Sequence, residues 1–395
     1  MSNAPSAAAA DAHAGAGNAA LIALIRAEIE RAGGMIPFAR YMELALYAPG
    51  LGYYDTARGQ PGARGDFVTA PELGPLFARC LARQCAPILT ETAGEIIEAG
   101  AGSGRLCADL LIELARLGAL PTRYRILDAS AGLRAAQRET IAALPSALRD
   151  RVEWLERLPE RIVGVVLANE VLDAMPVEIV RLDDHSGDDA GGWRMGVGVE
   201  QDRFVWRAGP LPDTLHDTLA TLVRDRLSTR DLPRPYVTEI NPLAEAWTRT
   251  IGERLQRGAL LIVDYGFPPD EYYHPARARG TLMCHARQRV HADPLVLPGL
   301  QDITAHVDFG AIAEAGRDAG LSLLGYTSQA AFLLALGITD LVTDDQSDAR
   351  AQLAATTEIK KLTLPHEMGE LFKVLALGRG IGTPLAGFRL APRRL

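Results

Sequence analysis

The stretch from Ile96 to Leu106 reads Ile-Ile-Glu-Ala-Gly-Ala-Gly-Ser-Gly-Arg-Leu, an apolar strand that ends in an acid and three alternating glycines. Glycine lets the backbone turn sharply and approach a ligand closely. The residues from Arg105 to Leu117 follow with the apolar spacing of a helix, and the N-terminus of that helix would face the ligand. The stretch therefore predicts a strand, turn and helix unit that holds a nucleotide-like cofactor.

The spacing of the glycines separates two classes of cofactor. A dinucleotide fingerprint needs Gly-x-Gly-x-x-Gly, but Arg105 occupies the place of its third glycine. The pattern from Glu98 to Gly104 is Glu-x-Gly-x-Gly-x-Gly, which resembles motif I of S-adenosylmethionine-dependent methyltransferases. A nicotinamide oxidoreductase is the alternative, and Arg105 argues against it.

Composition excludes several classes of protein. The chain has 395 residues, enough for one α/β core with substantial additions, and its formal net charge of −8 argues against nucleic acid as the main partner. No apolar run approaches the ~20 residues that span a bilayer, and the start lacks the layout of a secretory signal. We therefore expect a cytoplasmic protein without membrane insertion. We also expect no metal site, because no metal-ligand spacing joins Cys80, Cys85, Cys107 and Cys284.

Strand and helix patterns alternate through the first half of the chain, which predicts a mostly parallel sheet with helices on both faces. The apolar strand Val163–Ala168 suits a central position, because a strand that is covered on both faces must be apolar throughout. The fold class expected is α/β, a Rossmann-like core with an accessory helical and β-hairpin region that covers the substrate. The other core elements are strands at Glu95–Ala99, Tyr124–Leu127 and Val152–Leu155 and helices at Arg105–Leu117 and Gly132–Ala143.

The chain divides by composition into five regions. The connection 267–307 is longer than compact domains usually tolerate without a functional reason. Thr69 with Glu72 three residues on is a helix N-terminus signature. The regions are a disordered tail (1–20), an N-terminal helical region with a cofactor-covering loop (21–90), the first part of the core (91–182), an insertion of a hairpin and helices (183–257), and the rest of the core with a long substrate loop and C-terminal strands (258–395).

Acidic and amide side chains end the predicted core strands, and ligands bind beyond the carboxyl ends of such strands. Asp128 follows the glycine turn by about the ~20 residues at which an acid meets ribose hydroxyls. Its alternative role is to cap the next helix. Glu98 would orient the glycine turn or receive the ammonium group of the cofactor. Asn169 and Asp264 end two further strands.

The segment 169–176 ends the central strand, where the reactive end of a cofactor would lie. Glu170 and Asp173 are three residues apart and would share one face if the segment is helical. Carboxylates match the fork of a guanidinium and accommodate its charge as a proton leaves, so Glu170, Asp173 and the distant Glu239 are candidate catalytic residues. The alternative role of these three acids is to form salt bridges with arginine-rich loops. His291 in the long connection is either an acid–base group or a polar loop residue.

Together these segments resemble one family, the MidA-type, mitochondrial complex I assembly-factor-like proteins, a class I methyltransferase group of bacteria and mitochondria. The likeness covers most of the chain. It is carried by residues 47–54 (Tyr-Ala-Pro-Gly-Leu-Gly-Tyr-Tyr), 65–72 (Gly-Asp-Phe-Val-Thr-Ala-Pro-Glu) with Gln84, 98–105, 127–130, 168–177 (Ala-Asn-Glu-Val-Leu-Asp-Ala-Met-Pro-Val), 264–266, 279–282 and 298–309.

The resemblance implies S-adenosylmethionine as cofactor, with S-adenosylhomocysteine as product, and a protein substrate. In the mitochondrial branch it implies symmetric dimethylation of an arginine in a respiratory complex I subunit. A homodimer is left open, and the alternative function is a non-catalytic assembly or scaffold protein that keeps the fold. By motif position the residues implied to line the cofactor site are Asp66, Thr69, Glu98, Gly100, Gly102, Gly104, Asp128 and Asn169.

The chain departs from the family pattern at two places. Met283-Cys284-His285 stands where an aromatic residue is expected, so the substrate pocket is not defined by the resemblance. Asp128 stands where the family often has Glu, and the shorter acid should still reach a ribose.

Overall fold

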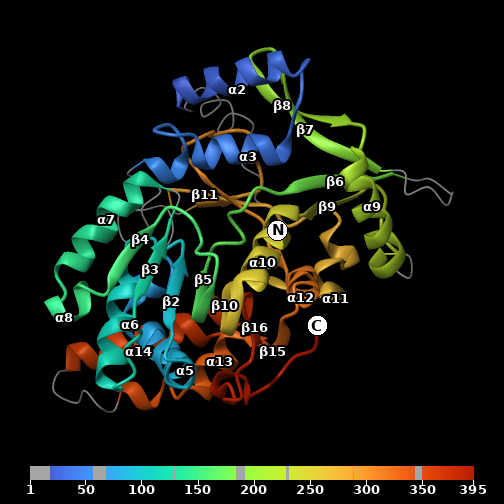
Figure 1. Ribbon diagram of the computed structural model, residues 1–395. Coiled ribbons are helices and arrows are strands. Elements are labelled where there is room, and N and C mark those ends of the chain that lie inside the picture. The colour runs from blue at the N-terminus through green and yellow to red at the C-terminus, as the bar shows by residue number, and fades with distance from the viewer. Residues whose placement is uncertain are drawn as a thin grey trace.

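The computed structural model describes residues 18–56, 68–128, 130–183, 192–227, 231–287, 289–342 and 349–395 (Figure 1). Asp66, most of the predicted tail and the glycine-rich loop 58–65 lie outside these residues. In the described part, no helix is long and apolar enough to cross a membrane.

An eight-stranded sheet forms the core. β10, β5, β2, β3 and β4 are parallel neighbours, and β16 runs antiparallel between β10 and β15. The strand order reverses between β2 and β5, and ligands of open α/β sheets bind at such a point. The order is β15 (Ser322–Ser328), β16 (Phe372–Arg379), β10 (Leu255–Phe267), β5 (Ile162–Asn169), β2 (Glu95–Ala99), β3 (Tyr124–Leu127) and β4 (Val152–Leu155), with β14 (Val307–Asp308) paired to β10.

Helices cover both faces of this sheet, which confirms the predicted fold class. Successive strand residues point to opposite faces: Ile96 joins the hydrophobic core on one side of the sheet and Ile97 joins the core on the other. The first side holds α5 (Leu76–Thr92), α6 (Arg105–Arg116) and α13 (Gln329–Ala335), and the second holds α10 (Pro242–Arg254) and α12 (Phe309–Asp318).

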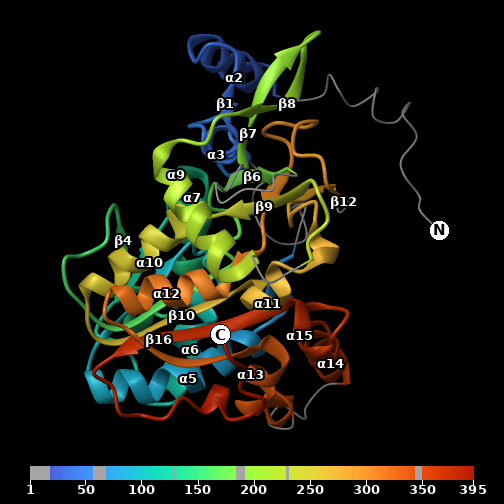
Figure 2. The same cartoon turned by 90° about the vertical axis from the view of Figure 1, so that its right-hand side faces the viewer.

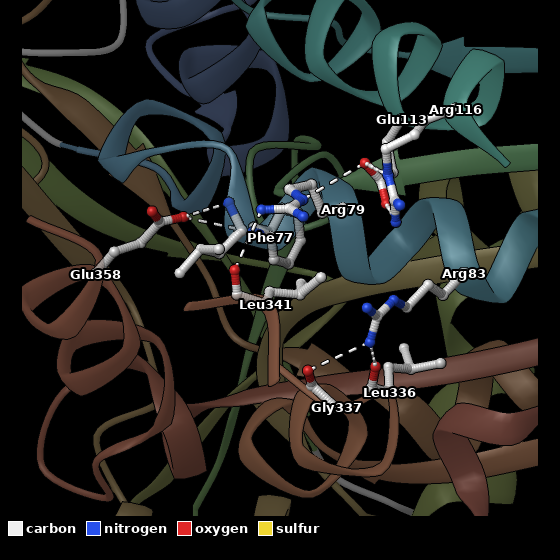
Figure 3. Close-up of polar contacts among 10 residues, drawn as sticks. Phe77, Arg79, Arg83, Glu113, Arg116, Leu336, Gly337, Leu341 and Glu358 are labelled. Atoms are coloured by element: carbon white, nitrogen blue, oxygen red, sulfur yellow. Dashed lines mark hydrogen bonds and ion pairs between the residues drawn. The ribbon is translucent and has the colours of Figure 1, made fainter. Parts of the chain in front are cut away.

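The C-terminal helices brace α5 (Figure 3). Glu358 of α14 (Ala349–Thr363) accepts a hydrogen bond of 2.8 Å from the backbone N–H of Leu76 at the first turn of α5. A carboxylate at a helix N-terminus is stabilised by the unpaired N–H groups there. About two helical turns further along α5, Arg83 donates to the Leu336 carbonyl at 2.8 Å. The position of α5 is therefore set by residues more than 250 positions away in the chain.

A smaller layer covers one end of the core sheet (Figures 1 and 2). It holds α2 (Ala19–Arg31), α3 (Phe38–Tyr47) and a five-stranded sheet of β1 (Ile36–Pro37), β6 (Glu178–Leu182), β7 (Gly192–Glu200), β8 (Arg203–Gly209) and β9 (Tyr236–Ile240). The predicted hairpin is the pair β7 and β8. β11 (Met283–Ala286), β12 (Arg289–His291) and β13 (Asp302–Thr304) form a three-stranded sheet inside the long connection 267–307.

Two elements depart from the predicted division of the chain. β6, which we placed in the core, pairs with β7 and β9 of the accessory sheet. α10, which we placed in the insertion, packs on the core through Ala244 and Ile251. Hydrogen bonds between strands place β6 in the accessory sheet, and the burial of its apolar side chains places α10 on the core. The remaining α-helices of the described residues are α4 (Ala70–Leu73), α7 (Ala131–Ala142), α8 (Ser146–Arg149), α9 (Asp213–Leu222), α11 (Pro269–Tyr272) and α15 (Met368–Leu371).

Candidate active site

A cavity of about 1010 Å³ opens where the core sheet meets the accessory layer. Small-molecule sites usually measure ~300–1000 Å³, so this cavity is as large as the largest of them. We call the part lined by residues of the segments 98–106 and 127–133 the glycine end. We call the part lined by Glu170, Asp173 and Asp302 the acidic end.

The backbone of the glycine end has the conformation that only glycine adopts without strain. The φ angles of Gly100, Gly102 and Gly104 are +63°, +51° and +82°. A Cβ atom on Gly100 would lie 3.0 Å from Cγ2 of Val171. Gly100 and Gly102 line the cavity, whereas Gly104 lies behind them as the N-terminal cap of α6.

Glu98 lies at the floor of the glycine end. Its carboxylate is buried and accepts a hydrogen bond of 2.8 Å from the Tyr124 hydroxyl. Burial raises the pKa of Glu98 to about 7, although the Tyr124 hydrogen bond opposes the shift. A carboxyl with this pKa changes its charge readily when a cation is placed beside it.

Asp128 lines the glycine end at the end of β3. Its oxygens accept hydrogen bonds from the Ser130 N–H at 2.9 Å and from the Gln137 amide at 2.8 Å. The helix-cap alternative for Asp128 is wrong, because Ser130 caps α7 by accepting from the N–H of Leu133 at 3.2 Å. Its predicted contact with ribose stays a prediction.

Thr69 and Glu72 border the glycine end from α4. The helix N-terminus predicted here is confirmed, since α4 begins at Ala70 with Thr69 as its N-cap residue, although the Thr69 side chain makes no capping hydrogen bond with the described residues. Glu72 instead accepts a hydrogen bond from the Ser103 hydroxyl and so ties α4 to the glycine turn.

At the acidic end, Glu170 has a φ angle of +53°, which is strained for a residue with a side chain. Its N–H donates to the Val263 carbonyl at 2.9 Å, and its carboxylate accepts from the Asn169 amide at 3.1 Å. Burial, and secondly the charge of Asp264, raise the pKa of Glu170 to about 8. The fold thus holds an acid in a strained conformation beside other acids.

Asp173 is 4% exposed, and its Oδ1 atom has no hydrogen-bond partner among the described residues. Burial and the charges of Asp264 and Glu170 raise its pKa well above the usual range. The helical face predicted for Glu170 and Asp173 is wrong. The segment is a turn, in which Asp264 accepts from the N–H groups of residues 171–173 at 2.9–3.3 Å, yet both acids line the cavity.

The structure adds residues to the acidic end to which the sequence reasoning gave no role. The Tyr54 hydroxyl donates to Asp302 at 2.8 Å, and the Tyr47 hydroxyl donates to the Ala174 carbonyl at 2.9 Å. Tyr47 and Tyr54 lie in the segment 47–54 and Asp302 lies in the segment 298–309, and both segments carry the family resemblance. That likeness was the signal that could have found them. Tyr265 and His285 also line the cavity.

The structure does not bring Glu239 to the cavity. Glu239 is 2% exposed and accepts hydrogen bonds from the N–H and the hydroxyl of Thr281, both at 2.9 Å. Glu239 therefore makes a structural contact with Thr281, and the catalytic contact that we predicted for it is wrong. His291 also lies away from the lining residues, and its Nδ1 accepts from the N–H of Asp293 at 3.3 Å.

The strand order of the core, with a glycine turn after its first parallel strand and acids at the strand ends, defines a class I methyltransferase. Residues 80–327 match the family model described as "Putative S-adenosyl-L-methionine-dependent methyltransferase". The chain belongs to this family, and the MidA-like resemblance is confirmed.

A solved structure and two curated relatives illustrate the likeness. A superfamily member from Burkholderia thailandensis, bound to S-adenosyl-homocysteine, is 48% identical with a TM-score of 0.88, and the alignment covers 100% of this chain and 98% of that one. "Protein arginine methyltransferase NDUFAF7, mitochondrial" of Danio rerio is 28% identical over 88% of this chain and 84% of its own. The Homo sapiens protein of the same name is 26% identical over 87% and 80%.

S-adenosylmethionine is therefore the cofactor, and the residues of the glycine end fit it. Gly100 and Gly102 leave space beside the backbone, and Glu98 and Asp128 offer carboxylates for an ammonium group and for hydroxyls. The buried Oδ1 atom of Asn169 has no partner in the described part of the chain, so it can accept a hydrogen bond from a ligand. Asp66 lies outside the described residues.

Proposed function

We propose that this methyltransferase modifies the guanidinium group of an arginine in a protein substrate. Symmetric dimethylation of a respiratory complex I subunit is the specific form of the proposal. The observation that carries it is the acidic end of the cavity, where Glu170, Asp173 and Asp302 converge among the tyrosines Tyr47 and Tyr54.

The chemistry of arginine fits this arrangement. A guanidinium has a pKa above about 12 and stays charged, and its planar fork pairs with carboxylates through two parallel hydrogen bonds. The buried acids of the acidic end have raised pKa values, so a bound cation restores their ionised forms. Aromatic rings beside the acids offer faces to the same cation.

When bound, S-adenosylmethionine supplies an electrophilic methyl group. The acids fix the guanidinium so that one nitrogen is oriented for attack, and orientation with exclusion of water supplies much of the rate. In this proposal Glu170 accepts the proton that the attacked nitrogen loses, and Asp173 holds the opposite edge of the guanidinium. The names of the Danio rerio and Homo sapiens relatives support an arginine in a protein as the acceptor.

The test uses the full-length protein, labelled S-adenosylmethionine and an extract of cells that lack the protein. We expect label in methylarginine after acid hydrolysis, and loss of methylation from a complex I subunit in the deletion cells, measured by mass spectrometry. Calorimetry with S-adenosylhomocysteine is the control for an intact glycine end. Cofactor binding without any methyl incorporation would favour the non-catalytic scaffold instead, and label in another amino acid would change the acceptor.

A further inference from the structure

The helix α10 carries two apolar stripes, of which the core uses one. Ala244 and Ile251 are buried against the core sheet. On another side of the helix, Leu243 is 50% exposed, Ala246 is exposed and Trp247 is partly exposed. The outward face of an amphipathic helix is normally polar, and although Trp247 also packs in part against the core, Leu243 and Ala246 leave an apolar surface on this side of the helix.

The second stripe borders the candidate active site. α10 follows β9 of the accessory sheet and runs along one face of the core (Figure 1). Its first two turns line the same continuous cavity as the acidic end, through Pro242, Leu243, Ala246 and Trp247.

Two ion pairs also contribute to the lining of the cavity. Arg194 of β7 pairs with Glu178 of β6, and Arg40 of α3 lies 2.7 Å from Glu43. These four residues line the cavity together with the apolar stripe. Arg40 also pairs with Glu28 of α2 at 2.5 Å, and pairing of this kind weakens the attraction of each charge for a ligand. The apolar stripe therefore offers apolar contact, whereas the acidic end offers carboxylates to a cation.

We propose that Leu243, Ala246 and Trp247 form the docking strip for the polypeptide segment that flanks the target arginine. The inference rests on the proposed function: with an arginine held at the acidic end, the neighbouring residues of its chain enter the same cavity, and these three residues give that cavity an apolar contact surface. The occupant is an extended segment of the protein substrate with a large apolar side chain near the arginine. Trp247 is the expected centre of the contact, since tryptophan is enriched among the few side chains that carry most of the binding energy at interfaces.

The test measures initial rates of methylarginine formation at increasing concentrations of extract from cells that lack the protein. We expect Trp247→Ala to raise the apparent KM about 30-fold and Leu243→Ser about fivefold, with kcat changed by less than about twofold. Leu353→Ser is the matched control, because Leu353 is 68% exposed on α14, outside the cavity, and we expect wild-type kinetics. Affinity for S-adenosylhomocysteine reports whether each variant is folded.

The outcomes separate the docking strip from the proposed function. If the wild-type protein forms no methylarginine, the proposed function fails and the strip fails with it. If the wild type is active and Leu243→Ser and Trp247→Ala keep its KM, only the docking strip is overturned. A photo-reactive phenylalanine at position 243 gives a second readout: the cross-linked peptide should come from the segment of the acceptor that carries the methylated arginine, and a cross-link to another segment contradicts the proposal.

Discussion

The two ends of the cavity are built in opposite ways. Most of the glycine end comes from two neighbouring strands and the turns that follow them, within 36 residues of sequence from position 98 to position 133. The acidic end joins Tyr47, Glu170, Tyr265 and Asp302, which are spread over more than 250 positions. Cofactor binding is therefore a local property of the chain, whereas acceptor binding depends on how distant segments pack.

This difference predicts that substitutions at one end leave the other intact. Glu170→Gln should show the largest effect, because it removes the proposed proton acceptor and keeps the shape of the side chain. We expect kcat to fall about 100- to 1000-fold while the affinity for S-adenosylhomocysteine stays within about twofold. Steady-state kinetics and calorimetry on the same preparation check both parts.

Glu239→Gln is the matched control, since Glu239 is an equally buried acid outside the cavity lining. We expect a loss of about 1–3 kcal/mol in the free energy of unfolding, from the weakened contact with Thr281, and kcat within about threefold of wild type. Equal losses of kcat in both variants would mean that burial, and not position in the cavity, explains the effect of Glu170.

Gly100→Val should break the glycine end. A side chain at a φ of +63° is strained, and its Cβ would meet Val171 at 3.0 Å. We expect the affinity for S-adenosylhomocysteine to fall about 100-fold by calorimetry. Gly118→Val is the control, because Gly118 has a φ of +67° with no atom within 4 Å of its built Cβ. If both variants bind equally well, space at the glycine turn is not what the cofactor needs.

Asp128→Asn tests the comparison of the two ends of the cavity through a smaller expected change in affinity. If Asp128 binds ribose hydroxyls, the neutral amide should lower the affinity for S-adenosylhomocysteine about tenfold, since hydrogen bonds to a charged group are the stronger ones. Asp302→Asn at the acidic end should leave that affinity unchanged and raise the KM for the acceptor protein. If Asp302→Asn weakened the binding of S-adenosylhomocysteine and Asp128→Asn raised the KM for the acceptor protein, the two ends would have the opposite roles.

The last prediction concerns the pH dependence of stability and not binding or catalysis. The pKa of Glu170 is raised from 4.5 to about 8, so between these values the folded state holds a proton that the unfolded state has lost. Stability from this group therefore falls as pH rises through the window, by up to about 5 kcal/mol at ~1.4 kcal/mol for each unit of the shift. Urea unfolding at pH 5 and pH 8 should show a smaller decline for Glu170→Gln than for wild type. Identical declines would show that the carboxyl is already ionised at pH 5.

The predictions from sequence followed the same division. The strand boundaries of β2, β3 and β4 and the glycine turn were predicted correctly, because alternation, apolar runs and glycine spacing are local signals. The segment of Glu170 and Asp173 is not the helix that would have given these acids a shared face, because Asp264, about ninety residues away, accepts hydrogen bonds from its N–H groups in a turn. Glu239 was misplaced because nothing in its neighbouring sequence indicates that Thr281 will cover it.

The sequence by itself determined the fold class and the cofactor, since both depend on residues that are close together in the chain. The tertiary structure decided which acids face the cavity, because β10 brings Tyr265 beside the end of β5, and β13 brings Asp302 to Tyr54. It also exposed the apolar stripe of α10 at the same cavity. Side chains from distant segments meet only after strands pair and cores close, and that pairing leaves no local pattern in the sequence.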